Sequence, residues 1–345
     1  VESPMLRAEI VAQWLEQFCP NSPFRAVVVD DGQRWQAVLP LSETRVGRVL
    51  SAGGLTCDPW APCGDLLCDQ AGDVAPTMDQ LVRGLRQLPW QLLWLNDAQP
   101  EAPQWQAFTA ACRRASVACE HHERFHIGRL AIEGSLEAYQ KRLGKSHRQT
   151  VLRSIRRLSA EGDLQFEMLT PTDAADLEHL LREAFAIENL SWKGKEGTSI
   201  LQTPGMFEFF VRQATRLMAN GEIRLALLRY NERILAFIYG FAAKGVFFGH
   251  KIGYDPQFYK HSPGQVLFFW LIEQFYAKGD VQYLDFVGPM TEWLSRWRPD
   301  TYPVGRIVVA PRRLIGRTAL FAYKNLWRRY RKHPTLAAVA ADDSE

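Results

Sequence analysis

The chain has 345 residues, of which 47% are hydrophobic and 23% are charged. This composition gives ample apolar material for packed cores and too little charge for intrinsic disorder, and the length suits about two domains. A single small module held together by disulfides or by a metal is excluded by size. The longest clean apolar run, residues 266–272, is far short of the roughly 20 residues that span a bilayer, so a transmembrane helix is excluded too. Because the N-terminus has no basic segment followed by an apolar core, a cytoplasmic location is expected.

Charge and cysteine are distributed unevenly. Residues 1–125 contain 10 Arg, no Lys and 15 acids, a balance of −5, so the remainder of the chain carries +8. All six cysteines also precede residue 125. These shifts predict an N-terminal domain over 1–125 and a second domain over 126–310, followed by a basic helix and tail over 311–345.

The cysteines do not predict a metal site. Cys57, Cys63 and Cys68 are separated by six and five positions, whereas zinc pairs are usually two to four apart, and no His lies nearby. Reduced, partly buried thiols are expected instead.

The first half alternates strands and helices. Two apolar runs flank Asp30-Asp31-Gly32-Gln33, which predicts a β-hairpin over 24–41. Further along, periodicity and turn signals predict a strand at 64–68, a helix at 77–88, a strand at 90–95 and a helix at 103–118.

The second half repeats this order in longer form. A strand at 128–132 leads into one long basic helix at 135–160 and a strand at 164–169, and Thr172 or Asp173 caps a helix that continues to about residue 188. The remaining pattern predicts a helix at 206–219, an antiparallel meander at 223–229, 234–242 and 246–254, an apolar helix at 266–277 and a strand at 281–286.

The order of meander, helix-opening turn, crossover helix and further strand is that of the GNAT acyltransferase core. The first half fits the same template by element order. The predicted fold class is therefore α/β, with two tandem GNAT-like units that each have a mixed, largely antiparallel sheet flanked by helices.

Four segments carry a more specific resemblance: ENLSWKGKEG at 188–197, HKIGYD at 250–255, SPG at 262–264 and LDF at 284–286. The chain resembles the CelD-like acetyltransferases associated with bacterial cellulose and exopolysaccharide synthesis. These belong to the GNAT superfamily and are similar to the FemABX-type transferases, which also have two GNAT units. The resemblance implies an acyl-CoA, such as acetyl-CoA, as donor and no metal.

The turn Ser262-Pro263-Gly264-Gln265 is the predicted donor-binding element. Pro suits a first helical turn, Gly lets the backbone approach a ligand, and the free N–H groups favour an anion such as the CoA pyrophosphate. The alternative is a helix start without any ligand.

Acyl transfer needs a base, a donor for the oxyanion and an acid for the leaving thiolate. Glu188, at the end of an apolar helix, and Asp285, in a strand that reads as buried, are candidates for base or orienting acid. The alternatives are a solvated Glu188 and an Asp285 that pairs with Arg or Lys. Tyr254 could protonate the thiolate. Because no cysteine lies in the second half, direct attack is expected rather than a covalent intermediate.

Other side chains are candidates for substrate binding. Lys193 and Lys251 could hold anionic groups, and Trp192 could form an apolar or sugar-stacking wall. A two-residue strand period places His250, a further substrate-binding candidate, on the same face as Tyr254, with Lys251 on the opposite face.

Two basic tracts remain. The tract at 312–332 reads as a basic amphipathic helix that could contact an anionic membrane or dock on the protein. The other could bind RNA phosphates or form a solvated helix face; it consists of Lys141, Arg142, Lys145, Arg148, Arg153, Arg156 and Arg157.

The predicted function is transfer of an acyl group from acyl-CoA to an amino or hydroxyl group of a sugar or surface-polysaccharide precursor. The protein would be cytoplasmic, or would lie peripherally at the inner face of the membrane. One alternative is a FemABX-like aminoacyltransferase that uses charged tRNA. The other is a catalytically inactive GNAT-like scaffold in polysaccharide synthesis.

Overall fold

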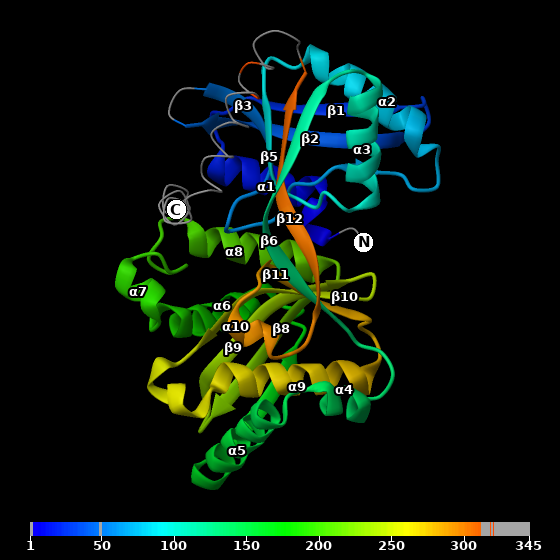
Figure 1. The fold of residues 1–345 in the computed structure, drawn as a ribbon. Helices are drawn as coiled ribbons and strands as arrows, with labels where there is room; N and C mark the ends of the chain where they lie inside the picture. Colours follow the sequence, from blue (N-terminus) through cyan, green and yellow to red (C-terminus); the bar gives the residue numbers. More distant parts are fainter. Residues whose placement is uncertain (1–2, 48–49, 312–317, 319, 321–345) are drawn as a thin grey trace. The chain divides into compact units, whose positions relative to one another are not determined.

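The computed structural model describes residues 3–47, 50–311, 318 and 320. The chain forms two compact units: unit 1 consists of Val1–Gln13 and Phe125–Tyr302, and unit 2 of Trp14–Arg124 and Pro303–Glu345 (Figure 1). Each unit therefore combines two segments that are distant in sequence. The predicted boundaries near 125 and 310 instead treat each domain as one continuous segment. The predicted basic helix at 312–332 lies almost entirely outside the described residues.

The sheet of unit 1 has the strand order β6-β11-β10-β9-β8-β7. Pairing is antiparallel except between β10 and β11, which run parallel because helix α9 crosses over between them. The strands are β6 (Ala118–Ala131), β7 (Leu164–Leu169), β8 (Ile223–Tyr230), β9 (Arg233–Ala243), β10 (Val246–Tyr254) and β11 (Tyr283–Pro289).

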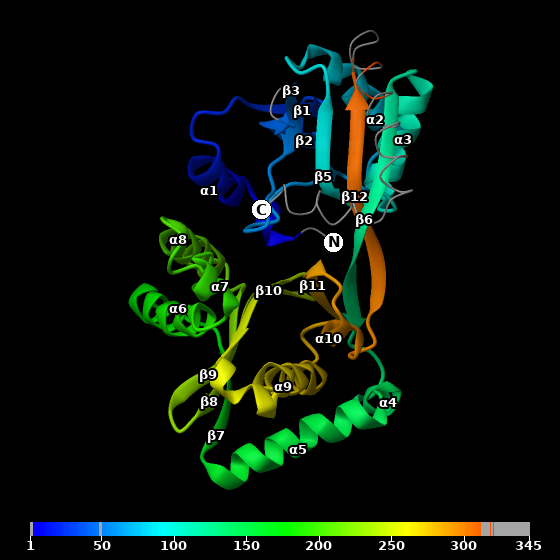
Figure 2. The same ribbon diagram turned by 60° about the vertical axis from the view of Figure 1, so that its left-hand side comes forward.

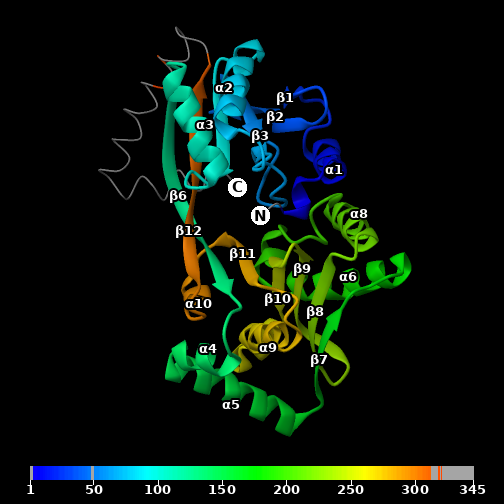
Figure 3. The same ribbon diagram turned by 90° about the vertical axis from the view of Figure 1, so that its right-hand side faces the viewer.

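Helices cover both faces of this sheet. Figures 2 and 3 show α6 (Ala174–Asn189) and α8 (Met206–Ala219) on one face and α9 (Pro263–Lys278) on the other. On the first face, the ring of Phe185 in α6 contacts those of Phe210 in α8 and Tyr239 in β9. On the second face, α9 lies between the sheet and α5 (Lys145–Glu161), which explains why α9 is apolar nearly all round.

The long helix predicted over 135–160 is in fact two helices, α4 (Leu136–Arg142) and α5. Leu143 takes an extended conformation and is buried, and Gly144, a poor helix former, caps the start of α5. The break lets α5 leave the direction of α4 and pack on α9 and on the 3-10 helix η3 (Pro256–His261).

Unit 2 repeats the order of elements. The hairpin of β1 (Phe24–Asp30) and β2 (Trp35–Val46), which confirms the prediction, continues into β3 (Leu50–Leu55). β5 (Leu93–Ala98), which lies beside β3 in the sheet, runs parallel to it after the crossover helix α2 (Val74–Gly84). β12 (Asp300–Ala310) lies beside β5, and Trp105 and Phe108 of α3 (Pro103–Arg114) are core residues.

Several short elements complete the described chain. They are η1 (Pro4–Leu6), α1 (Ala8–Phe18), β4 (Leu67–Cys68), η2 (Leu85–Gln87), α7 (Trp192–Glu196) and α10 (Glu292–Ser295). No helix within the described residues is both long and apolar enough to cross a membrane.

Candidate functional site

Pairing between β10 and β11 is short and ends within the sheet. Val246, Phe247 and Phe248 lie opposite Tyr283, Leu284 and Asp285, and no register continues beyond these three pairs. β10 nevertheless runs on to Tyr254 along β9, and β11 runs on to Pro289 along β6. We call this divergence of two parallel strands the fork.

Both strands are irregular where they diverge. On β10, Gly249 pairs with Gly240 and Lys251 with Tyr239, so His250 is a bulge residue with no residue opposite it. On β11, residues 286–288 lie opposite the single residue Gly128. Val287 has φ +62°, a conformation that β-branched residues rarely adopt. Bulges and strained backbone concentrate at functional sites.

Gly128 makes room for the irregularity of β11. A Cβ atom at this position would lie 2.5 Å from Met290 Sδ and 2.6 Å from the Phe286 ring. Any larger residue at position 128 would therefore displace the segment that follows Asp285.

Asp285 lies at the base of the fork and is only 2% exposed. Its Oδ2 accepts hydrogen bonds from the Tyr302 hydroxyl at 2.9 Å and from Arg129 Nε at 3.3 Å, and its Oδ1 accepts the Val287 N–H at 2.9 Å. Burial raises the pKa of Asp285, whereas the Val287 N–H and Arg129 act in the opposite direction. The result is a buried carboxylate with a fixed orientation and an increased affinity for a proton.

The Asp285 cluster was only partly predictable. Pairing of Asp285 with an Arg was one of the two alternatives drawn from the sequence, and Arg129 is that partner. Arg129 follows Gly128 in a predicted strand, which is only a weak sequence indication that it lies at the site. No sequence feature indicated Tyr302, because the segment around it was not predicted as a strand.

The bulge overturns the predicted faces of β10. The ring of His250 lies 5.7 Å from that of Phe210, and Lys251 Nζ lies 5.3 Å from the same ring, so both side chains face α8. Tyr254 lies on the α9 side, since a Cβ atom at Gly264 would be 3.6 Å from its ring. The prediction that His250 shares a face with Tyr254 is wrong, because one extra residue shifts the two-residue alternation.

The start of α9 retains unused hydrogen-bonding groups. Ser262, with φ +46°, ends η3, and its carbonyl accepts the N–H groups of Gln265 and Val266. Pro263 has no N–H, so the Gly264 amide is one of the donors that a helix start leaves unsatisfied. Among the described residues, the buried atoms His261 Nδ1 and Gln265 Oε1 also have no hydrogen-bond partner.

Space around Gly264 is open. Apart from the Tyr254 ring and the adjoining backbone of α9 itself, no atom of the described residues lies within 4 Å of the position that a Cβ atom at Gly264 would occupy. An anionic group could therefore reach the amide at the positive end of α9. The residues present fit the phosphates of a CoA-like donor.

Glu188 is buried and ion-paired rather than solvated. It is 2% exposed, its Oε1 lies 2.7 Å from Lys193 Nζ, and its Oε2 accepts the Ile200 N–H at 3.0 Å. The neighbouring side chain of Asn189 accepts hydrogen bonds from Ser199 and Gln202.

The two predicted carboxylates, Glu188 and Asp285, are thus held by different partners. Glu188 and Asn189 organise the loop 188–202, whereas the partners of Asp285 come from β6, β11 and β12. Trp192, at the start of α7, is 59% exposed.

In unit 2 the equivalent strands are bridged by the chain's own loop. β3 and β5 pair only at Gly53 and Leu93, and Cys57 Sγ then lies 3.6 Å from the Asn96 carbonyl oxygen. The loop folds back on β3, since Thr56 Oγ1 donates to the Cys63 carbonyl at 3.2 Å. Burial raises the pKa of the Cys57 and Cys63 thiols, so both are kept protonated.

Nowhere in the described ranges do three or more His, Cys, Asp or Glu side chains form a group that could hold a metal ion.

Comparison with known proteins agrees with this geometry. Residues 145–294, which lie within unit 1, match the acetyltransferase (GNAT) domain family. No curated protein matches the chain.

Solved structures that resemble the chain cover nearly all of it at low identity. FemX has a TM-score of 0.58 at 10% identity and covers 89% of this chain and 92% of its own. The C-terminal domain of a protein named as a lysylphosphatidylglycerol synthetase from Agrobacterium fabrum has a TM-score of 0.54 at 12% identity and covers 92% and 95%. L-PGS from Bacillus licheniformis has a TM-score of 0.52 at 13% identity and covers 92% and 96%. The predicted fold class of two tandem GNAT-like units is confirmed.

The buried Glu188–Lys193 pair predicts a specific pattern of stabilities. Lys193→Met should lower the free energy of unfolding by roughly 2–3 kcal/mol, between the values for exposed and buried pairs, because Glu188 stays buried without its ammonium partner. The double variant Glu188→Gln/Lys193→Met should lose less of the free energy of unfolding, since glutamine is uncharged and can still accept the Ile200 N–H. Urea unfolding of the single and double variants measures both effects. A double variant less stable than Lys193→Met would contradict this role of the ion pair.

Proposed function

We propose that this protein is an acyltransferase that takes an acyl group from acyl-CoA at the fork of unit 1. The acceptor would be an amino or hydroxyl group of a sugar or surface-polysaccharide precursor. The observation that supports this most is the end of β10–β11 pairing at Asp285, with β10 followed by η3 and then the start of α9. A carboxylate and an anion-binding helix start thereby occur along one strand pair.

Donor binding would use the start of α9. Ser262, Pro263, Gly264 and Gln265 would hold the CoA phosphates, with the Gly264 amide as hydrogen-bond donor and His261 as a further polar group. The donor itself supplies a thioester that is activated for attack. Unit 2 has a bridged fork instead, which favours unit 1 as the catalytic unit.

Asp285 is the better candidate for the base. Glu188 lies 2.7 Å from the Lys193 ammonium, a closer ion pair than the 3.3 Å between Asp285 and Arg129, and it anchors the loop 188–202 away from the fork. Asp285 has a raised pKa, which brings a carboxylate closer to the range useful for proton transfer near neutral pH. Asp285 would take the proton of the attacking amine or hydroxyl, while Arg129 and Tyr302 fix its orientation.

The positions of the remaining predicted residues bear on their roles. Tyr254 is exposed beside Gly264, so it would contact the phosphate end of the donor, which the pantetheine arm separates from the thiolate that it was predicted to protonate. Lys251 and His250 lie together on the α8 side of β10, where they could contact the acceptor. The exposed ring of Trp192 suits stacking on a sugar. The acceptor class rests on the resemblance to CelD-like acetyltransferases.

A second candidate is aminoacyl transfer from charged tRNA, as in the FemABX-type enzymes. It is favoured by the similarity to the FemX fold and by the cations of α5. The two candidates differ in the donor, so donor binding separates them.

The donor prediction can be tested with one pair of variants. Acetyl-CoA should bind the wild type and Gly264→Ala, because a methyl group there meets only the Tyr254 ring. Gly264→Glu should weaken binding at least tenfold, since its carboxylate repels phosphate, while an acid in the first turn suits the helix. Titration calorimetry measures the affinities, and circular dichroism checks the fold. Failure of the folded wild type to bind acetyl-CoA would favour charged tRNA or the scaffold alternative.

The role of Asp285 predicts a pH dependence. The base must be ionised, and its pKa is raised, so kcat/KM should fall on the acid side at a pH above the ordinary Asp value of about 3.9. Tyr302→Phe removes a hydrogen bond that favours the ionised form of Asp285, so it should move this acid-side fall in kcat/KM, the acid limb of the profile, to higher pH. Asp285→Asn should lower kcat by about 100-fold or more.

Thiol release from acetyl-CoA with amino-sugar acceptors gives the pH profiles. Glu188→Gln is the control and should leave the limb in place. A loss of about 100-fold in kcat in Glu188→Gln, with no shift of the acid-side fall in Tyr302→Phe, would assign the base to Glu188 instead.

A further inference from the structure

Helix α5 presents a strongly cationic outward face. Lys145, Arg153, Arg156 and Arg157 are exposed, and at 100° per residue they fall within an arc of about 120°. The opposite face is fixed in the protein, because Val151, Ser154 and Leu158 are buried. The cations are therefore held outward by packing of the helix.

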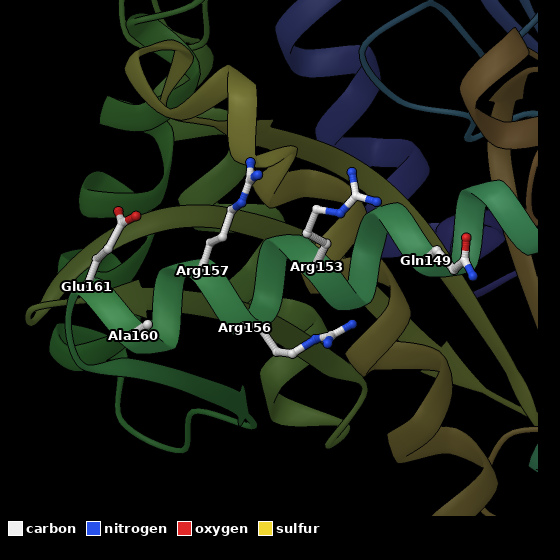
Figure 4. A pocket seen from close by; sticks show the side chains of 6 residues that line it. All are labelled: Gln149, Arg153, Arg156, Arg157, Ala160 and Glu161. Carbon is white, nitrogen blue, oxygen red and sulfur yellow. The ribbon is translucent and has the colours of Figure 1, made fainter.

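Figure 4 shows a pocket lined by side chains of this one helix. Arg153 and Arg157 extend together on one side of the helix, and Arg156 extends on the other. The lining residues are Gln149, Arg153, Arg156, Arg157, Ala160 and Glu161.

These cations have no acidic partner within the described part of the chain. Arg156 Nε donates to the Leu152 carbonyl at 3.3 Å, and neither Arg153 nor Arg157 forms an ion pair there. The neighbouring helices differ, since Lys141 pairs with Glu137 on α4 and Arg182 pairs with Glu178 on α6.

The spacing of the cations is unfavourable for the helix by itself. Arg153 and Arg157 are four positions apart, an arrangement in which like charges weaken a helix. The acid on this helix, Glu161, lies in its final position. An external anion would offset this repulsion.

We propose that the outward face of α5 docks on an anionic phospholipid surface. An exposed helix whose arginines extend outward suits contact with a plane of headgroups, and the arginines can pair with the phosphates. Leu152, 37% exposed among the cations, adds an apolar contact. The exposed face carries no aromatic side chain for stacking on unpaired bases, which favours lipid over single-stranded RNA.

This surface is independent of the proposed donor site. It would hold unit 1 at a membrane, where a lipid-linked acceptor would be concentrated. The interaction adds a partner to the protein rather than a step to its reaction.

The experiment is co-sedimentation of the full chain with lipid vesicles. Wild-type protein should bind vesicles of equal parts phosphatidylcholine and phosphatidylglycerol, bind phosphatidylcholine alone far more weakly, and dissociate as salt is raised. Arg153→Gln/Arg156→Gln/Arg157→Gln should bind the anionic vesicles about 100-fold more weakly, at about tenfold for each 1.4 kcal/mol. Arg25→Gln/Arg83→Gln/Arg113→Gln removes the same charge from exposed positions of unit 2 and should bind nearly as the wild type does.

Both triple variants keep residues 312–332, so the difference between them isolates α5. Circular dichroism confirms that each variant is folded. Equal binding by the two variants would overturn the proposal, as would equal binding of wild type to neutral and anionic vesicles. A structured RNA that displaces the protein from anionic vesicles, with its affinity lost in the α5 variant, would overturn it in favour of RNA.

Discussion

The candidate site depends on the burial of one carboxylate where two parallel strands stop pairing. An ionised Asp285 in this position would be costly without compensation, and it receives hydrogen bonds from Arg129, Tyr302 and the Val287 N–H. These donors come from β6, β12 and β11, so the site forms only when segments far apart in sequence meet. The positive φ of Val287 and the missing side chain of Gly128 both serve this arrangement.

The two units share one order of elements but differ in the segment that follows the meander. In each, an antiparallel meander is followed by a crossover helix and a strand parallel to the last strand of the meander. In unit 2 the loop after β3 is buried against its own sheet, with Cys57 and Cys63 as inert apolar groups. In unit 1 the strand instead leads to a helix start with open space at Gly264. Loop packing therefore distinguishes a structural unit from a candidate catalytic one.

Local signals predicted most of the fold, and non-local ones were missed. The helix at 206–219 and the strand at 164–169 match α8 and β7 in both bounds, because capping residues and periodicity mark their ends. The polar run at 120–124 hid the first half of β6, and β12 was not recognised as a strand. Asp285 stood out as an acid in an apolar strand. The bulge at His250 could not be read from the sequence, since it arises from pairing with β9.

The proposed function depends on a donor that lies along the fork of unit 1. Hydrogen–deuterium exchange of the full chain, followed by mass spectrometry with and without acetyl-CoA, tests it most directly. Binding should slow exchange at residues 249–265 and 285–290, with no change at 53–66 and 93–98 of unit 2. Protection of the unit 2 segments, with none at the fork of unit 1, would rule out a donor site at this fork.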